Sequence, residues 1–432
     1  MSPKPSLMPL PPAVILTGNA APPRSPKSAG EIALALSRSL GRRRVPVYRF
    51  HPERSLIDLE SRYCTHVPCP NLYDEGPALV TALLSFAKAQ PAKPVLFPAA
   101  DGAVEFVAQN EEVLGKAFAL ACARWECVQE VQNKQRLLEH ASRIGVPIPD
   151  TCFPKSASEL DAFASSLQYP AVVKPLTSHH WKRPEVAAVV EGAKALVVND
   201  AGELGRVYRR VAPLAPDMMV QEIIPGEIDR LLTFLGYVGH DGTPLAGCVR
   251  KKLRQYPAGF GYCCLAETVR DPEIMELSIR LLTSLGYRGI AGVEFKRDPR
   301  TGKAKLIEIN ARAVRTTSTA IGAGVDLPWI AYQDLANPDS RPSPVFDYRV
   351  PVRWIHVRSE IRAAIPMIRR GELSFWKWIR IFRGPKAQVM WAWDDPKPGL
   401  LNVLLPTFHR LSQKFVPRKG TPAALPLGAA RQ

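Results

Sequence analysis

The sequence has no hydrophobic run long enough to cross a lipid bilayer. A membrane-spanning helix needs about twenty predominantly apolar residues, and no uncharged stretch of this 432-residue chain approaches that length. The first segment, MSPKPSLMPLPPAVILTGNAAPP, has a short apolar core broken by prolines, so it makes a poor signal peptide. We therefore expect a cytoplasmic protein that begins with a disordered leader over residues 1–12.

The sequence also lacks the cysteine and glycine patterns of several common sites. Its eight cysteines include no CxxC pair and have no ladder of nearby histidines, which argues against structural zinc and against a disulfide framework. We expect reduced, mostly buried thiols. No GxGxxG follows the first predicted strand, so dinucleotide binding is not supported.

The composition is that of a globular protein with a large positive charge. Hydrophobic residues make up 46% and charged residues 22% of the chain, and its length is sufficient for two or three domains. The net charge of +17 is distributed unevenly, because residues 341–432 hold 17 Lys and Arg against five Asp and Glu. The molecule that binds this basic tail can therefore differ from the substrate of the preceding part of the chain.

The first third of the chain alternates between strand and helix patterns. Apolar strand patterns cover residues 13–18, 45–50 and 94–101, and helix patterns cover residues 28–40, 75–89 and 103–120. This alternation predicts a parallel, Rossmann-like sheet. Asp101 follows the third strand, where capping the next helix is a commoner role than contacting a ligand.

The middle of the chain continues with shorter strands and capped helices. The patterns predict a helix from Asn133 to about Ile144, strands at residues 169–175, 194–200 and 218–229, a hairpin about Asp241-Gly242, and helices starting at Asp271 and Asp326. Asp200 and Glu203 form a helix-start capping pair. Lys174 ends an otherwise apolar strand, where it is either a solvated edge residue or a contact for an anion.

A predicted β-hairpin over residues 289–312 carries the strongest chemical signal. Two alternating runs flank the turn sequence DPRTG, so Val293, Phe295, Ile307 and Ile309 should share one face. The opposite face carries Glu294, Lys296, Glu308 and Asn310. With the turn near Thr301, Glu294 lies across from Glu308.

Two carboxylates that face each other repel unless a cation lies between them. Oxygen ligands of this kind suit Mg²⁺, or the similar Mn²⁺, which takes one or two carboxylates and completes its coordination with water and substrate phosphates. The alternative is an ordinary amphipathic hairpin whose polar face meets water. The motifs that precede the hairpin favour the metal interpretation.

Five motifs in order resemble the ATP-grasp superfamily of ATP-dependent carboxylate ligases. They are NK at a helix start, VVKP, QEIIPGE, a basic strand, and GVEF with IEINAR, and they span about 180 residues. VLFPAAD and NKQRLLEHASRIGVPIPDT resemble the branch of carboxylate-amine ligases related to D-aspartate ligase. The resemblance implies an α/β ATP-grasp fold with an N-terminal Rossmann-like domain.

The resemblance also implies a set of site residues. Lys134 and Lys174 would contact the phosphates of ATP, and Glu294, Glu308 and Asn310 would hold Mg²⁺. The nucleotide would lie along Gln221, Glu222, Ile223 and Ile224, with Glu227 or Asp229 at the ribose. Arg312 would stabilise the transferring phosphoryl group, and Arg250 and Lys251 would meet an acidic substrate or phosphate.

The implied reaction activates a carboxylate as an acyl phosphate, which an amine then attacks to give an amide, ADP and phosphate. The partners would be a small-molecule carboxylate and amine. One departure is the loop PLTSHHWKRPEV, which has no glycine where many family members have a glycine-rich phosphate-covering loop. We expect His179 and His180 to be exposed loop residues. The alternative to an enzyme is a non-catalytic, nucleotide-binding scaffold at a membrane surface.

The expected division is a Rossmann-like domain over 13–124, a lid subdomain over 125–225, a catalytic subdomain over 226–340 and a basic extension over 341–432. Five of the eight tryptophans lie in this extension, among arginines and lysines. That mixture has three interpretations: a tail packed on the core, an interfacial element at an anionic membrane on the inner face, or, less favoured, a nucleic-acid stripe.

Overall fold

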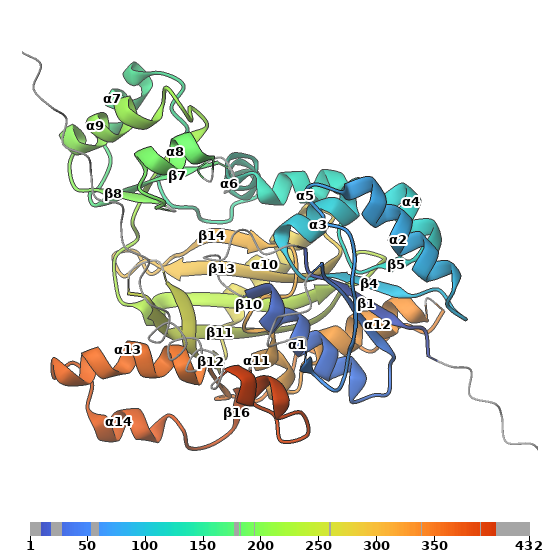
Figure 1. Ribbon diagram of the computed structural model, residues 1–432. Helices are drawn as coiled ribbons and strands as arrows, with labels where there is room; N and C mark the ends of the chain where they lie inside the picture. The colour runs from blue at the N-terminus through green and yellow to red at the C-terminus, as the bar shows by residue number, and fades with distance from the viewer. Residues whose placement is uncertain are drawn as a thin grey trace, which may run out of the picture.

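The computed structural model describes residues 10–402, apart from residues 19–27, 53–59, 177–180, 182, 194, 259–260, 338 and 389. The described residues form three β-sheets with helices packed around them (Figure 1). One sheet has five strands, the next along the chain has four, and the third has seven.

The five-stranded sheet is parallel throughout and has the strand order β3-β2-β1-β4-β5. Its strands are β1 (Ala13–Leu16), β2 (Val47–Phe50), β3 (Thr65–Val67), β4 (Val95–Pro98) and β5 (Ala119–Leu120). The accompanying helices are α1 (Ser28–Gly41), α2 (Gly76–Lys88), α3 (Asp101–Gln109) and α4 (Glu111–Ala117). This order confirms the predicted Rossmann-like sheet.

Two details of this region differ from the prediction. The residues predicted as one helix over 103–120 form α3 and α4, which are separated at Asn110. Ala100, not Asp101, occupies the N-cap position of α3, and no side chain caps that helix. The predicted capping role of Asp101 is wrong, because its carboxylate instead pairs with the guanidinium of Arg312.

The four-stranded sheet has the order β6-β9-β7-β8, and its paired strands are antiparallel. Its strands are β6 (Thr151–Cys152), β7 (Ala171–Pro175), β8 (Leu196–Val198) and β9 (Met218–Glu222), with helices α5 (Trp125–Gln132), α6 (Lys134–Arg143), α7 (Ala157–Ala164), α8 (Pro184–Val189) and α9 (Ala201–Val211). Figure 1 shows this sheet and α7 to α9 projecting above the seven-stranded sheet. Asn133 caps α6 and Asp200 caps α9 as predicted.

The seven-stranded sheet has the order β14-β13-β10-β11-β12-β15-β16. Its strands are β10 (Leu231–Val238), β11 (Pro244–Tyr256), β12 (Tyr262–Val269), β13 (Gly289–Arg297), β14 (Ala304–Asn310), β15 (Arg353–Ile355) and β16 (Lys386–Gln388). Helix α10 (Pro272–Ser284) covers one face, where Phe234 and Leu281 share a core cluster. Asp271 caps α10 as predicted.

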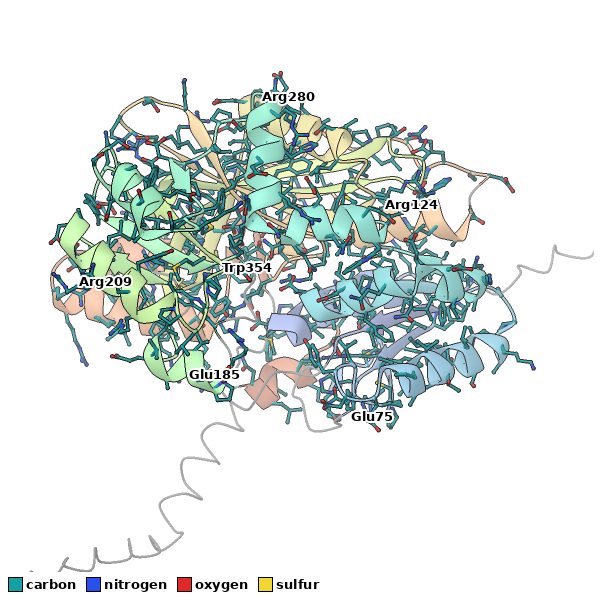
Figure 2. The ribbon with its side chains drawn as sticks, turned by 90° about the horizontal axis from the view of Figure 1, so that it is seen from above. Glu75, Arg124, Glu185, Arg209, Arg280 and Trp354 are labelled. Carbon is teal, nitrogen blue, oxygen red and sulfur yellow. The ribbon has the colours of Figure 1, made fainter. Side chains whose placement is uncertain are left out.

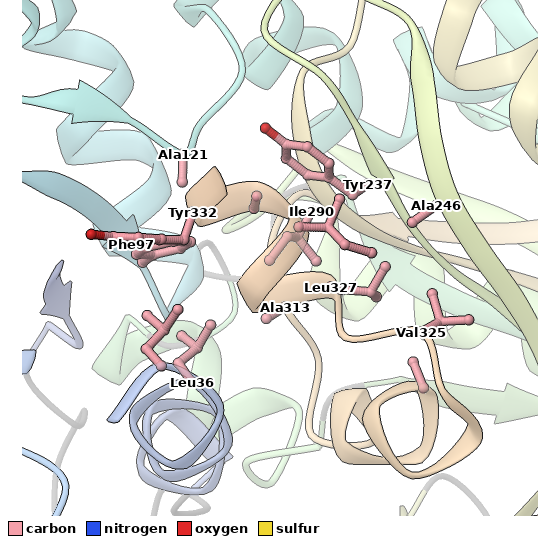
Figure 3. Packing of buried hydrophobic residues seen from close by; sticks show 14 of the residues in the cluster. Leu36, Phe97, Ala121, Tyr237, Ala246, Ile290, Ala313, Val325, Leu327 and Tyr332 are labelled. Carbon is pink, nitrogen blue, oxygen red and sulfur yellow. The ribbon is translucent and has the colours of Figure 1, made fainter. Parts of the chain in front are cut away.

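A second core cluster joins the five-stranded sheet to the other face of the seven-stranded sheet. Helices α11 (Thr317–Ala323) and α12 (Leu327–Ala336) follow β14. Figure 3 shows Leu36 of α1 and Phe97 of β4 on one side of Tyr332, with Tyr237 of β10 on the other side. Because these residues belong to one cluster, the two sheets share one hydrophobic core. Each fully buried large apolar side chain in it stabilises the fold by about 1.5–3 kcal/mol.

Part of the basic tail belongs to the seven-stranded sheet. Strand β15 pairs with β12, β16 pairs with β15, and Trp354 of β15 is fully buried. Asp395 forms an ion pair with Arg38 of α1 at 2.9 Å. These contacts support the packed-tail interpretation for the strands and for the segment around Asp395. Helices α13 (Val357–Arg369) and α14 (Phe375–Arg380) lie between β15 and β16 in the sequence. None of the helices in the described part of the chain is long and apolar enough to cross a membrane.

Candidate functional site

One face of the seven-stranded sheet carries a row of polar residues across four neighbouring strands. Arg250 of β11 is opposite Thr233 of β10, Thr233 is opposite Glu294 of β13, and Glu294 is opposite Glu308 of β14. Directly opposed residues have their side chains on the same face, so the two carboxylates lie side by side. This confirms the predicted hairpin and the predicted pairing of Glu294 with Glu308.

The hairpin contains a bulge that the alternating pattern did not predict. The register shifts after Glu294, so that Phe295 pairs with Leu306 and not with Ile307. Leu306 is therefore fully buried in the core, and Ile307 is only partly buried. The expectation that Ile307 lies on the apolar face is wrong, because the extra residue of a bulge is left out of the alternation.

The carboxylates are surrounded by groups that affect their charge. The guanidinium of Arg250 lies 3.6 Å from Glu294 Oε1 and donates a hydrogen bond to Thr316 Oγ1. Asn310 Nδ2 donates to Glu308 Oε1 at 3.1 Å. Desolvation by the surrounding protein has the largest effect and raises the pKa of Glu308, and the negative charge of Glu294 raises that pKa further. The Glu308 side chain nevertheless remains exposed to solvent. A cation between the carboxylates would relieve their repulsion.

Glu294, Glu308 and the amide oxygen of Asn310 fit a magnesium ion, because Mg²⁺ takes one or two carboxylates and leaves other positions to water or phosphate. No cluster of three or more His, Cys, Asp or Glu residues suited to a metal occurs in the described ranges. A zinc site of the usual protein-ligand kind is therefore not found there.

Two lysines from the four-stranded sheet region approach the same carboxylate. Lys134, at the first position of α6, donates to the carbonyl of Leu176 at 3.3 Å. Lys174, on β7, donates to Gln221 Oε1 at 3.4 Å. Burial lowers the pKa of both lysines, and the Glu308 carboxylate acts in the opposite direction on each. Lys134, Lys174 and Glu308 therefore come together as the sequence predicted.

The basic strand β11 divides its charged residues between two faces. Arg250 shares the face of Glu294, whereas Lys251 lies on the opposite face and pairs with Glu267 at 3.2 Å. The expectation that Lys251 joins Arg250 in the site is wrong, because adjacent side chains along a strand point to opposite faces.

Lys252 returns to the face of Arg250, and it is only 8% exposed. It makes no hydrogen bond or ion pair with any residue that the structure describes. Its ammonium nitrogen is not among the buried side-chain atoms without a partner, so the side chain is mostly buried while its charge stays accessible, and Lys252 is a candidate for contact with an anion. The sequence reasoning missed it, although the parity of strand positions from Arg250 points to it.

The predicted adenine-contacting stretch has a mixed outcome. Glu222 does not present a free carboxylate, because Arg300, Lys305 and the backbone NH of Asp150 all donate to its oxygens. The expectation that its side chain reads the adenine edge is therefore corrected. Burial alone would raise the pKa of the Glu222 carboxyl. Its ion pairs with Lys305 and Arg300 outweigh that effect, so the pKa of Glu222 is lowered.

The rest of that stretch lies around the break at Gly226. Gln221 is buried and donates to Thr151 Oγ1 at 3.0 Å. The NH of Ile223 donates to the carbonyl of Pro170, and the carbonyl of Ile224 accepts from Lys296 Nζ at 2.6 Å. Glu227 and Asp229, predicted for the ribose, are both exposed.

Two arginines in the segment that follows β14 form ion pairs with carboxylates of α3 and α1, the helices beside the five-stranded sheet. Arg312 donates two hydrogen bonds to the carboxylate of Asp101, at 2.7 and 3.0 Å. Arg315 pairs in the same way with Glu31 of α1, and His356 lies 3.3 Å from the same carboxylate. These pairs could not be predicted from local sequence patterns, because the partners are far apart in the chain.

The glycine-free loop is only partly described. His179 and His180, predicted to be exposed loop residues, lie outside the described residues. Trp181 is buried in the core of the four-stranded sheet. Its Nε1 has no hydrogen-bond partner among the residues that the structure describes.

The fold and this arrangement of residues define the class. The chain has the ATP-grasp fold, and residues 215–357 match the model of a family described as ATP-grasp in the biosynthetic pathway with Ter operon. The matched segment includes the seven-stranded sheet from β10 to β15, and thus the row from Arg250 to Glu308.

Among curated proteins, the chain is similar to D-aspartate ligase of Enterococcus faecium. The two are 24% identical over 276 residues, which is 61% of this chain and 64% of that ligase. The chain therefore spans less than two thirds of the relative's length.

Solved structures of the same fold include an L-amino acid ligase from Bacillus licheniformis. It is 16% identical with a TM-score of 0.54, and the match covers 76% of this chain and 74% of that one. The biotin carboxylase of Campylobacter jejuni in a β,γ-ATP complex is 17% identical with a TM-score of 0.56, over 77% and 72% of the two chains. At these identities the likeness shows the fold.

Proposed function

We propose that the protein is an ATP- and Mg²⁺-dependent ligase that joins a small-molecule carboxylate to an amine and releases ADP. The observation that carries the proposal is the opposed pair Glu294 and Glu308, with Lys134 and Lys174 close to Glu308 and Lys252 on the same sheet face. A non-catalytic scaffold would have no use for two repelling carboxylates and a lysine whose ammonium has no partner in the described chain.

Each group has a task that follows from its charge and position. Lys134, Lys174 and Lys252 would bind the phosphates of ATP as fixed cations, an arrangement that suits phosphoryl transfer because little covalent work is needed from the protein. Glu294, Glu308 and Asn310 would hold Mg²⁺, which when bound neutralises phosphate charge. Gln221 to Ile224, with Glu227 or Asp229, would border the nucleoside.

Arg250 and Arg312 would stabilise negative charge on the transferring phosphoryl group and on the carboxylate that receives it. Both are held in place before any substrate binds, Arg250 by Thr316 and Glu294 and Arg312 by Asp101. The acyl phosphate that results would be attacked by the amine. The relationship to D-aspartate ligase supports an acid and an amine as the substrates.

The eight cysteines are all free thiols, and burial raises the pKa of Cys122 and Cys248 to about 12. Such thiols stay protonated and unreactive, as in a protein that works in a reducing cytoplasm.

The test is ADP release by the purified full chain with ATP, Mg²⁺ and pools of carboxylates and amines, supplied together and separately. We expect release above background only when one acid pool and one amine pool are both present. The Glu294→Gln variant should bind ATP but release no ADP. If the protein binds ATP but releases no ADP with any combination of pools, the scaffold is favoured.

A further inference from the structure

Helices α13 and α14 expose an unusual amount of large apolar surface. Val357, Ile361 and Ile365 of α13 are each about 40% exposed, and Phe375 and Trp376 of α14 are 48% and 71% exposed. Residues four apart on a helix lie on one face, so the three aliphatic side chains form a continuous outer stripe. These five residues define the α13–α14 surface.

The side of α13 next to this stripe is anchored to the protein. Glu360 is fully buried, where it pairs with Arg254 of β11 and accepts a hydrogen bond from Cys264 Sγ of β12. Ala364, one turn later, is also fully buried. The stripe is therefore held in a fixed orientation beside the buried side of α13 and is partly exposed. In Figure 1, α13 and α14 lie on the other side of the seven-stranded sheet from the four-stranded sheet.

The apolar side chains are surrounded by positive charge. Residues 357–388 contain eight basic residues and two acidic ones. Glu360 is paired with Arg254, and Glu372 is paired with Arg370 at 2.6 Å. The basic residues are Arg358, Arg362, Arg369, Arg370, Lys377, Arg380, Arg383 and Lys386.

We propose that the α13–α14 surface docks on an anionic lipid membrane. Tryptophan and long basic side chains suit the headgroup region, where an apolar body and a charged end are both accommodated. Because neither helix can cross the bilayer, the surface would lie in the plane of the interface.

Two other occupants fit the surface less well. A second copy of the chain would bring the same excess of positive charge against it, and like charges repel. A nucleic acid would neutralise the arginines and stack on Trp376, but it offers no apolar surface for the stripe of Val357, Ile361 and Ile365. An anionic bilayer satisfies both the charge and the aliphatic stripe.

The experiment is co-sedimentation of the full chain with phosphatidylcholine vesicles that contain or lack phosphatidylglycerol, at low and high salt. We expect binding to the anionic vesicles at low salt, at least tenfold weaker binding at high salt, and none to the neutral vesicles. Charge screening weakens the electrostatic part of the attraction, so the salt response separates this mode from purely hydrophobic sticking.

Two pairs of variants locate the contact. Arg380→Glu with Arg383→Glu should reduce vesicle affinity at least tenfold. The matched control is Arg209→Glu with Arg210→Glu, which makes the same charge change on exposed residues of α9; Arg209 is labelled in Figure 2. In Figure 1, α9 lies above the seven-stranded sheet, whereas α13 and α14 lie below it. Phe375→Ser with Trp376→Ser should also abolish binding, whereas Trp393→Ala, another exposed tryptophan, should not.

Several results would overturn the proposal. They are no sedimentation with anionic vesicles at low salt, equal binding to neutral vesicles, or an equal loss in the α9 control. A dimer in light scattering that disappears in the Trp376 variant would assign the surface to a second copy. Salt-sensitive binding to RNA that exceeds vesicle binding would assign it to nucleic acid. Unchanged thermal unfolding of each variant shows that the fold is intact, whether or not ligase activity is found.

Discussion

At the scale of single residues, the site is organised around charges that lack full compensation. Glu294 and Glu308 face each other on adjacent strands, and Lys252 has a mostly buried side chain whose accessible ammonium has no hydrogen-bond or ion-pair partner in the described chain. Native interiors usually pair such groups. Where they do not, the missing partner is often a ligand, and substitutions there separate stability from binding.

Replacement of Glu308 by Gln should stabilise the ligand-free protein and remove its response to Mg²⁺. Because the pKa of Glu308 is raised in the folded state, the folded protein holds this proton more tightly than the unfolded chain. Stability therefore falls as pH rises through the raised pKa and remains lower at neutral pH. We expect Glu308→Gln to raise the free energy of unfolding by about 0.5 kcal/mol at pH 7, the scale of opposed like charges in a sheet.

The measurement is thermal unfolding with and without Mg²⁺ and ATP at several pH values. The wild type should gain stability from the ligands and the variant should not. A variant that is less stable than the wild type and still responds to Mg²⁺ would contradict the assignment of Glu308.

Lys251 and Lys252 provide a matched pair of adjacent lysines. Lys252→Ala should weaken ATP binding by roughly 1.5–3 kcal/mol, the range for a hydrogen bond to a charged group. Lys251→Ala should leave ATP affinity unchanged, because Lys251 lies on the other face beside Glu267. Calorimetric titration with ATP decides the matter, and equal losses in the two variants would count against the face assignment.

At the scale of elements, a buried ion-pair network connects the four-stranded sheet to the β13–β14 hairpin. Glu222 ends β9, whereas Asp298 and Arg300 lie in the hairpin turn and Lys305 lies on β14. The carboxylates of Glu222 and Asp298 are almost completely buried. The network fixes how the lysines carried by one sheet meet the carboxylates carried by the other.

Loss of one partner from this network should be costly. Glu222→Ala leaves Arg300 and Lys305 with one carboxylate instead of two, and removal of a buried partner costs about 3 kcal/mol. Because the pKa of Glu222 is lowered in the folded state, its contribution is present at neutral pH and is lost as pH falls through that lowered pKa. Urea unfolding at pH 7 and under acid conditions measures both effects. Glu203→Ala is the control: among the described residues, the Glu203 carboxylate accepts only from Asn199 at the exposed start of α9, so its loss should cost about 1 kcal/mol or less.

The elements that the sequence predicted well are those governed by local patterns. Alternating strands and helices, the hairpin turn and the caps at Asp200 and Asp271 all depend on residues within a few positions of one another. What was missed depends on distant partners. The bulge at Ile307, the partners of Glu222 and the pairing of Asp101 with Arg312 arise only when separate strands meet in space.

The site shows the same division. Glu294, Glu308, Lys134 and Lys174 could be singled out from the sequence, because each occurs in a short motif, and their roles as metal ligands and phosphate contacts stay predictions. The assignment of Lys251 to the site was wrong. Successive residues of a strand point to opposite faces, and a run of basic residues does not show which of them share the face of Glu294.

At the scale of the whole molecule, the end of the described chain is fastened to its beginning. Asp395 accepts hydrogen bonds from Arg38, from Ser61 and from the NH of Arg62. The adjacent Asp394 pairs with Arg42. A chain ended near Ser340 would lose these contacts together with β15, β16 and the buried Trp354, so point substitutions are the better probe of the tail.

Asp395→Ala should destabilise the protein by about 3 kcal/mol, because Arg38 would remain buried without its carboxylate. Asp394→Ala should cost at most about 1 kcal/mol, since Asp394 and Arg42 are both about 40% exposed. Chemical unfolding of the two variants compares neighbouring residues in one segment. Similar losses in both would show that the burial of Asp395 is not what matters.

The pairing of Arg38 with Asp395 has a consequence for how the protein is made. The two residues are 357 positions apart, and ribosomes add about 5–20 residues per second. Arg38 therefore leaves the ribosome on the order of tens of seconds before its partner has been synthesised. During that interval the carboxylate that pairs with Arg38 is absent, so this contact of α1 forms only after the intervening strands and helices have been synthesised. The last step in the packing of α1 thus waits for a residue that is translated much later, although α1 itself is among the first elements to be translated.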